Sequence, residues 1–518
     1  MKKSLSLLLA LALLLAAACI GHADERYVYT SAQYNVGPID ENPPVVQLIN
    51  EKYGVEFQMV YIEDSSRGQQ ISLLASSNEL PDIIYMPSAI DAQMLYDQGM
   101  IGTWTEEFFR EHAPRISAMI DTYAPSGWSA VKFDGKMYTV PGIRYVNTIP
   151  TCIAWNADWL AKLGVTEIPT SLEEMEKLLY RFAKEDPDGN GVDDTYGLAL
   201  QKEFYKHGHA TAVGLFYGYH AYPRSWIEKD GALAYGSVQP EMRGALLKLQ
   251  EWYKDGLIDP EFGVKDKAKV KETVSAGKVG VVYGTMSSAG AFLDASVVND
   301  PNADWKAFPV LSSDDQPALP ITKMPVTRYY AMSAKSEHPE ALIKLLNWSH
   351  QNAYGEQEDN SLSISPTGIA IWQYNVIGDE NPGKNLNAFK KIRTAFETGD
   401  PSILNTEERG YYDRILTWRN DKNPDGWTQD RIFGEQSSFA VIEQYVDSGN
   451  YITNKFYGTP TDSMNKYMST LEAMEAEVFT SIIMGEDISA FDKYVEDFYN
   501  LGGTEITNEV NAWYESVK

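Results

Sequence analysis

Strand-like and helix-like segments alternate along most of the chain, and this alternation limits the possible folds more than any other feature of the sequence. Residues 55–61 (VEFQMVY) alternate apolar and polar side chains, which is the period of a half-buried strand. Ser171 and Glu174 form a capping box at the start of a predicted helix that runs to about 184. Elements that alternate in this way predict an α/β fold.

The chain has 518 residues, and its length bears on the number of lobes. Single hydrophobic cores stop growing at about 250–300 residues, so the length predicts at least two lobes. Because the sequence contains no long linker, we expect several chain crossings between the lobes. Further predicted strands are 27–29, 80–86 and 278–283; further predicted helices are 45–52, 69–75, 239–253, 338–348 and, with breaks at Gly485 and at Gly502-Gly503, 464–518.

The first 23 residues have the pattern of an export signal. Two lysines precede an apolar run at 5–18, which suits a signal peptide and is too short to span a bilayer. Two processing routes stay open. Residues 16–19 (AAAC) resemble a bacterial lipobox, in which Cys19 becomes lipidated, whereas 21–23 (GHA) form an ordinary cleavage site. Either route predicts an exported protein of the cell envelope, periplasmic or anchored by lipid.

The charge balance excludes some partners. The chain has 72 acidic and 44 basic residues, a formal net charge of −28. Such a field repels nucleic acid and anionic membrane surfaces, so we expect no nucleic-acid partner and no membrane contact except through a lipid anchor. The same charge disfavours a highly anionic ligand.

Several segments, taken in order, resemble one protein family. Residues 74–83 (LASSNELPDI) resemble its "ASG-x-LPD" turn, 133–141 (FDGKMYTVP) its "DGKxYxxP" hairpin, and 156–164 (NADWLAKLG) its "DWLxKLG" helix. Weaker matches follow at 239–241, 256–262, 501–506 and 509–514. On these motifs the chain resembles the family 1 extracellular solute-binding proteins, particularly the long lipoprotein subgroup that includes the alginate-oligosaccharide binders.

The resemblance implies a two-lobed α/β fold of the type II periplasmic-binding-protein kind, with a hinge between the lobes. On this basis we place the N-terminal lobe at 24–145 plus about 300–350, and the C-terminal lobe at 146–299 plus about 351–518, with a helical tail. It also implies a monomer that delivers a small solute, expected to be an oligosaccharide, to ABC permease subunits. Ligand that binds the closed state more tightly shifts the population toward closure.

An acidic loop has the spacing of a calcium site. Oxygen-bearing side chains at alternate positions suit a hard cation, and Gly191 stands where an EF-hand loop needs its sharp turn. The predicted ligands are Asp186, Asp188, Asn190, Val192 through its carbonyl, and Asp194. An EF-hand loop ends in a Glu that binds calcium through both carboxylate oxygens, and this chain has Gly197 at that position. Relatives in the family instead close the site with an acidic residue at the position where this chain has Thr195. A structural calcium site and a solvated acidic turn both remain open.

Aromatic residues supply the predicted ligand contacts, because the apolar faces of sugar rings stack on aromatic rings. Five candidates lie in polar or turn-rich surroundings, at a lobe crossing or at a strand end: Tyr145, Trp226, Tyr283, Trp372 and Trp427. For each of them, packing or surface exposure is the alternative. Arg144 and Arg328 can hydrogen-bond ligand hydroxyls or a carboxylate, with a surface ion pair as the alternative.

No catalytic motif accompanies these residues. The sequence lacks H-E-x-x-H, G-x-S-x-G and a complete P-loop. Cys152 has no His close to it in sequence and fits a buried apolar position. We therefore expect a binding protein rather than an enzyme. Binding of a peptide or another solute is the first alternative, and a secreted glycosidase or lyase is the second.

Overall fold

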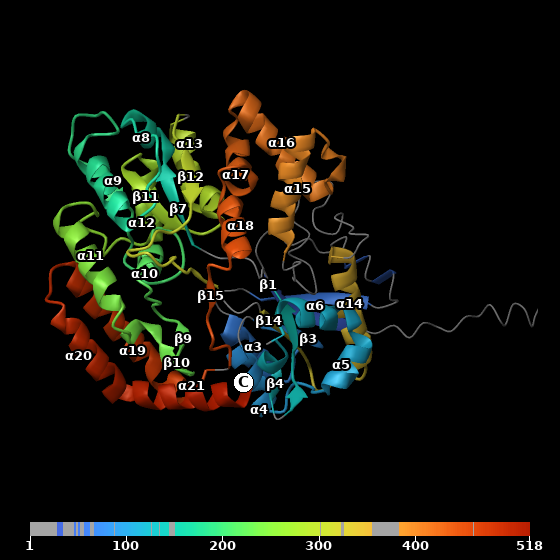
Figure 1. Ribbon diagram of the computed structural model, residues 1–518. Helices are drawn as coiled ribbons and strands as arrows, with labels where there is room; N and C mark the ends of the chain where they lie inside the picture. The colour runs from blue at the N-terminus through green and yellow to red at the C-terminus, as the bar shows by residue number, and fades with distance from the viewer. Residues whose placement is uncertain are drawn as a thin grey trace, which may run out of the picture. The chain divides into compact units, whose positions relative to one another are not determined.

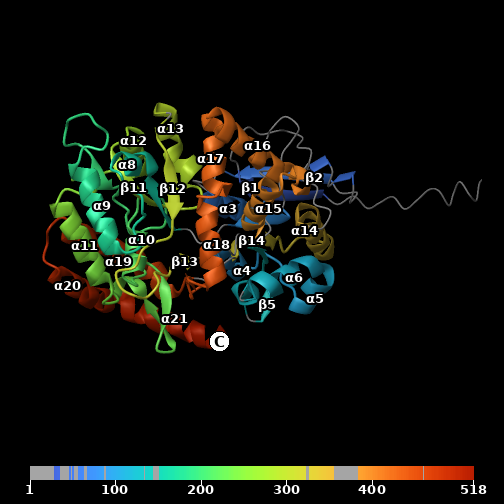
Figure 2. The same cartoon turned by 45° about the horizontal axis from the view of Figure 1, so that its top comes forward.

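The computed structural model divides the chain into two compact units (Figures 1 and 2). The first unit comprises 1–143 and 326–380, and the second comprises 144–325 and 381–518, so the chain crosses between them after residues 143, 325 and 380. The structure describes residues 28–34, 46–47, 50–51, 56–62, 67–86, 89–125, 127–133, 135–143, 151–300, 302–322, 326–354, 383–458 and 460–517.

A five-stranded sheet forms the centre of the first unit, in the order β2-β1-β3-β14-β6. Strands β1, β2 and β3 are parallel, and β14 is antiparallel to both β3 and β6. The predicted strands at 27–29, 55–61 and 80–86 are confirmed, each with a shift of its ends. The bounds are β1 Val28–Tyr34, β2 Glu56–Ile62, β3 Ile83–Met86, β6 Val140–Ile143 and β14 Val326–Met332.

Helices cover this sheet and supply its core. In Figure 1, α5, α6 and α14 form one group of helices in the first unit. Phe109 of α5 and Ile116 and Ile120 of α6 are fully buried. The helices are α3 Arg67–Ser76, α4 Ala89–Asp97, α5 Glu106–His112, α6 Pro114–Tyr123, α7 Gly127–Ala130 and α14 Pro339–Tyr354, and a hairpin joins β4 Lys132–Phe133 to β5 Lys136–Met137.

The second unit contains a four-stranded sheet in the order β12-β7-β11-β8. Strand β7 is antiparallel to β11 and β12, and β8 is parallel to β11. Residues 300–325, which the sequence analysis assigns to the N-terminal lobe, belong to this unit because β12 pairs with β7. The bounds are β7 Cys152–Asn156, β8 Tyr196–Leu198, β11 Val279–Gly284 and β12 Trp305–Phe308.

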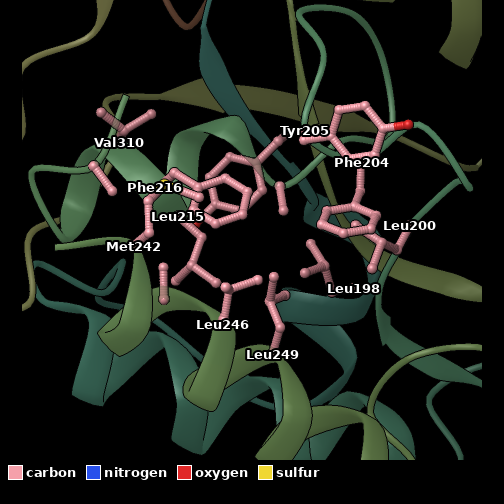
Figure 3. Close-up of a cluster of buried hydrophobic side chains, with 14 of the residues drawn as sticks. Leu198, Leu200, Phe204, Tyr205, Leu215, Phe216, Met242, Leu246, Leu249 and Val310 are labelled. Carbon is pink, nitrogen blue, oxygen red and sulfur yellow. The ribbon is translucent and has the colours of Figure 1, made fainter. Parts of the chain in front are cut away.

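The core of the second unit lies between this sheet and several helices. Figure 3 shows Leu215 and Phe216 of α10 in one cluster with Phe204 and with Leu246 and Leu249 of α11. Ser171 caps α9 as predicted, since its hydroxyl oxygen accepts the N–H of Glu174 at 3.2 Å. The elements are α8 Ala157–Lys162, α9 Leu172–Lys184, α10 Val213–Gly218, β9 Trp226–Lys229, β10 Ala232–Tyr235, α11 Met242–Lys254, α12 Lys267–Ser275 and α13 Asp294–Asn299.

The C-terminal part of the second unit is mostly helical. The breaks predicted at Gly485 and at Gly502-Gly503 are confirmed, because α19, α20 and α21 meet at these residues. Within the described ranges, no helix has the length and apolar character needed to cross a membrane. The elements are α15 Lys384–Thr398, α16 Thr406–Asp421, α17 Pro424–Phe433, α18 Ser438–Ser448, α19 Asp462–Ile483, α20 Ser489–Phe498 and α21 Thr504–Val517, and β13 Ile321–Thr322 pairs with β15 Ile452–Thr453.

Candidate functional site

In the first unit, an aromatic and cationic group lies on the two paired strands β3 and β14. Tyr85 of β3 pairs with Tyr330 of β14, and their ring centroids lie 5.6 Å apart. Arg328 stands two residues before Tyr330 on the same face of β14, and its guanidinium carbon lies 5.6 Å from the Tyr85 ring centroid. Tyr85 and Arg328 are half-buried, whereas Tyr330 is buried. We call these three residues the tyrosine–arginine group.

In the second unit, hydroxyl groups gather where β11 ends and β7 begins. Gly284 pairs with Cys152 at this end of the sheet, and the turn 285–288 follows. The Ser288 hydroxyl oxygen accepts the N–H of Thr285 at 2.8 Å, and the Thr285 and Ser287 hydroxyl oxygens lie 3.0 Å apart. Thr285 and Ser287 are half-buried, so they remain accessible to a polar partner.

Two histidines lie in the loop between β8 and α10, and they have different partners. His209 is buried, lies 3.0 Å from the Ser288 hydroxyl through Nδ1, and stacks on Phe292. Burial lowers the pKa of His209 to about 4, so its imidazole is neutral at neutral pH. His207 is half-buried, with its ring nitrogens 3.3 Å from the Tyr217 hydroxyl.

Three of the five predicted ligand contacts lie in the packed interior of the second unit. Trp226 is 4% exposed and lies between Tyr235 and Phe456, with ring centroids at 5.3 and 6.2 Å. Tyr283 is fully buried, and Trp427 is 1% exposed and donates its indole N–H to Asp304 at 3.1 Å. This burial favours packing roles, and ligand contact by these three rings stays a prediction.

The other predicted contacts, Tyr145 and Trp372, lie outside the described residues, as does Arg144. Sequence reasoning missed Tyr85 and Tyr330 as candidates, although it considered Arg328. Both tyrosines stand inside short strand-like runs, where an aromatic side chain has the pattern of a core residue. For Tyr85 the available signal was its position near the carboxyl end of β3, because ligands of open α/β sheets bind outside the carboxyl ends of the strands, and Tyr330 lies opposite it.

The acidic loop at 186–194 connects α9 to β8. The two carboxylate oxygens of Asp186 accept the backbone N–H groups of Asn190 and Gly191, at 3.2 and 2.9 Å. The Asn190 amide oxygen accepts the N–H of Val192 at 2.6 Å, and its amide nitrogen donates to Asp188 at 2.9 Å and Asp194 at 3.1 Å. The oxygen atoms predicted to bind calcium are therefore engaged with protein donors.

A lysine completes this loop. The Lys278 ammonium donates to Asp188 at 2.7 Å and to Asp194 at 2.8 Å. Across the described residues, no group of three or more His, Cys, Asp and Glu side chains is arranged so that it could hold a metal ion. The donor set in this arrangement does not fit a calcium ion, and calcium binding at these five residues stays a prediction.

Cys152 does not have the environment of a nucleophile. It is buried, and burial raises the pKa of its thiol to about 12. The sulfur lies 3.9 Å from the Thr285 carbonyl oxygen, with which the thiol makes a weak hydrogen bond. A thiol with this pKa stays protonated at neutral pH, so Cys152 serves as a small apolar residue, as the sequence predicts.

Comparison with known proteins assigns the chain to a family. The family of bacterial extracellular solute-binding proteins matches residues 39–355, which is more than half of the chain. The chain belongs to this family. It is therefore a solute-binding protein of the kind that serves ABC transporters, as the sequence motifs indicate. Family members are binding proteins rather than enzymes, and the extracellular class suggests an exported protein.

Individual relatives match this chain over nearly its whole length. Lipoprotein LipO of Bacillus subtilis is 23% identical and covers 93% of this chain and 90% of its own length. The polygalacturonan/rhamnogalacturonan-binding protein YtcQ of the same organism is 23% identical and covers 92% and 90%. The crystal structure of alginate-binding protein AlgQ2 without calcium ion superposes with a TM-score of 0.62 at 16% identity, covering 95% and 99%. The predicted two-lobed α/β fold is confirmed.

Proposed function

We propose that the solute of this protein is an oligosaccharide, delivered to the permease subunits of an ABC importer. The observation that supports this proposal best is the tyrosine–arginine group, Tyr85, Arg328 and Tyr330, near the end of the first sheet. A half-buried tyrosine ring offers a face to the C–H groups of a sugar, and a guanidinium beside it offers N–H donors to hydroxyl or carboxylate oxygens.

The named relatives support the same class of solute. YtcQ is a polygalacturonan/rhamnogalacturonan-binding protein, and AlgQ2 is an alginate-binding protein, so both take polysaccharide-derived ligands. Both of these ligands contain acidic sugars. The net charge of −28 disfavours a highly anionic ligand, whereas Arg328 supplies a local cation. Both neutral and acidic oligosaccharides are therefore candidate ligands, and the experiment must include both.

Thermal unfolding of the purified protein tests the proposal. The panel contains fructo-, malto- and galacturonate oligosaccharides, alginate oligosaccharides and short peptides. A ligand at about 100 times its Kd adds roughly 2.7 kcal/mol to the free energy of unfolding, which is a shift of a few degrees. A shift with one sugar class and unchanged sugar chains afterwards supports the proposal. A shift with peptides alone overturns the sugar assignment, and shortened sugar chains indicate an enzyme.

Anchoring through Cys19 is a second part of the proposal, and it is supported by the match to a relative named as a lipoprotein. Lipidation of Cys19, the last residue of the lipobox-like segment 16–19, would hold the protein at the membrane surface beside the permease. Incorporation of labelled fatty acid into the wild-type protein, and its loss in Cys19→Ala, is the expected result. Label retained in Cys19→Ala, or a mature protein that begins after Ala23, contradicts anchoring at this residue.

A further inference from the structure

We propose that the Lys278 ammonium takes the place of a calcium ion in the loop at 186–194, so that this loop keeps its shape without a metal. The ammonium nitrogen lies 2.7 Å from Asp188 and 2.8 Å from Asp194. These carboxylates are two of the predicted calcium ligands. A lysine donates three hydrogen bonds and carries one positive charge, so it can bridge carboxylates as a small cation does.

Strand pairing fixes Lys278 in this position. Strands β8 and β11 are parallel, with Val279 opposite Tyr196, and the N–H of Tyr196 donates to the Lys278 carbonyl oxygen at 2.9 Å. Lys278 therefore stands at the start of β11, directly beside the point where the acidic loop enters β8. Its side chain is 24% exposed, and that of Asp188 is 16% exposed. The pair is partly shielded from water, so it is screened less than a fully exposed pair.

The oxygen atoms of the loop are arranged for hydrogen bonds rather than for a metal. Calcium takes six to eight oxygen ligands at about 2.3–2.6 Å. Here the carboxylate of Asp186 accepts two backbone N–H groups, and the amide oxygen of Asn190 accepts a third. The amide nitrogen of Asn190 turns toward Asp188 and Asp194, where it donates hydrogen bonds. A donor group in this place repels a cation.

The loop also lacks the acidic ligand that closes an EF-hand. Counting from Asp186, the twelfth position is Gly197, where a Cβ atom would lie 2.8 Å from the Cβ of Leu179. No side chain fits there. The hydroxyl of Thr195 donates to the Phe182 carbonyl oxygen at 2.8 Å and so takes no part in the loop. At the ligand positions, the loop lacks the Glu of an EF-hand and gains the Lys278 ammonium, and this change of two positive charges equals the charge of a calcium ion.

Calcium titration of the EDTA-treated protein tests this proposal, independently of which solute the protein carries. Isothermal titration with CaCl2 should show no saturable one-to-one binding, and the Tm should be the same in EDTA and in excess calcium. Saturable one-to-one binding of calcium to the wild-type protein, with a rise in Tm, overturns the proposal.

Substitution of the lysine supplies the second measurement. Lys278→Met should lower the Tm in EDTA by about 2–5 °C, because two carboxylates lose their cation. Lys278→Arg keeps the charge and should melt within a degree or so of the wild type. Lys269→Met is the matched control, since Lys269 is 62% exposed and pairs with Glu272 on the surface of α12.

The outcomes of these variants are distinct. A loss of Tm in Lys278→Met beyond that of Lys269→Met supports the proposal, and a recovery of that loss in calcium would show that the freed carboxylates can bind a metal. If Lys278→Met melts like Lys269→Met, the ammonium has no structural role and the proposal fails. If Lys278→Met does not fold, the proposal is tested with Lys278→Arg, whose Tm should be the same in EDTA and in calcium.

Discussion

The side chain of Arg224 lies 2.8 Å from the carboxylate of Glu475, a residue 251 positions later in the chain. The carboxylate is almost completely buried near the middle of α19, and the guanidinium also binds Glu472 and stacks on the Tyr205 ring at 4.4 Å. Burial raises the pKa of Glu475, and Arg224 opposes this rise by stabilising the charged form. The pair joins the turn before β9 to the C-terminal helices.

Loss of this arginine should destabilise the second unit strongly. Arg224→Ala leaves Glu475 buried without its cation, and breaking a buried pair in this way costs about 3–5 kcal/mol of the free energy of unfolding. Urea denaturation followed by tryptophan fluorescence measures the loss. Arg243→Ala is the matched control, because its partner Asp492 is exposed, and it should cost less than about 1 kcal/mol. Equal costs for the two variants would contradict the role assigned to Arg224.

Stability should fall in mild acid because His209 is held neutral. Its pKa is about 4 in the folded protein, against 6.5 for the ordinary side chain, so between these values the unfolded chain binds more protons. The stabilisation is complete above pH 6.5 and is lost as the pH falls toward 4, with a slope of up to about 1.4 kcal/mol per pH unit. Denaturation at several pH values should show a smaller slope in His209→Gln.

Part of the acid sensitivity should persist in that variant. His350 in the first unit also has its pKa lowered to about 4 by burial, and it contributes with the same sign. His209→Gln should therefore reduce the pH dependence without abolishing it. A slope identical to that of the wild type would mean that His209 is protonated to the same extent in the folded and unfolded states.

Two glycines in the C-terminal helices should respond differently to the same substitution. Gly502 and Gly485 have positive φ values of 120° and 118°, so Ala at either is strained by about 1–3 kcal/mol. At Gly502 an added Cβ would also lie 2.4 Å from the Tyr467 ring, whereas nothing lies within 4 Å at Gly485. Gly502→Ala should therefore cost about 1–3 kcal/mol more than Gly485→Ala in urea denaturation. Equal costs would mean that the ring moves aside freely.

The tyrosine–arginine group should determine affinity for the sugar found in the thermal panel. Tyr85→Ala removes a half-buried ring and should weaken binding roughly tenfold, equivalent to about 1.4 kcal/mol. Arg328→Met should weaken binding of an acidic sugar by about 10- to 100-fold and of a neutral sugar by less. Titration calorimetry measures both. Tyr123→Ala, at an exposed ring of α6, should bind normally, and wild-type affinity in all three would place the ligand elsewhere.

Local pattern was sufficient for many of the elements. The alternation at 55–61, the cap at Ser171 and the breaks at Gly485 and Gly502 each depend on neighbours in sequence, and the structure shows all four. Half of the helix predicted at 45–52 lies outside the described residues, and the described ones, 46–47 and 50–51, are helical. The predicted lobe boundary near residue 300 differs from the observed boundary at 325, because the sheet to which a strand belongs is decided by its partner strand. Strand β12 pairs with β7, about 150 residues earlier, and a short apolar run does not reveal that partner.

Side-chain environments were harder to predict for the same reason. Trp427 has polar neighbours in sequence, yet its ring is buried. Its indole N–H donates a hydrogen bond to Asp304, which lies 123 positions earlier in the chain. Trp226 is likewise enclosed by Phe456. The contact between Lys278 and Asp188 spans 90 positions and depends on the pairing of β8 with β11. None of these partners leaves a signal in the local sequence.

The shared core of early and late segments in the second unit also has a consequence for synthesis of the chain. The largest core cluster of the second unit combines Trp155 and Leu179 with Phe479, Tyr494 and Val510, so early and late segments enclose one interior. During synthesis, residues near 155 emerge more than 300 positions before their partners near 479 and 510. Until the late helices arrive, the early segments cannot bury their apolar surface. Completion of this core therefore waits until the C-terminal helices have been synthesised.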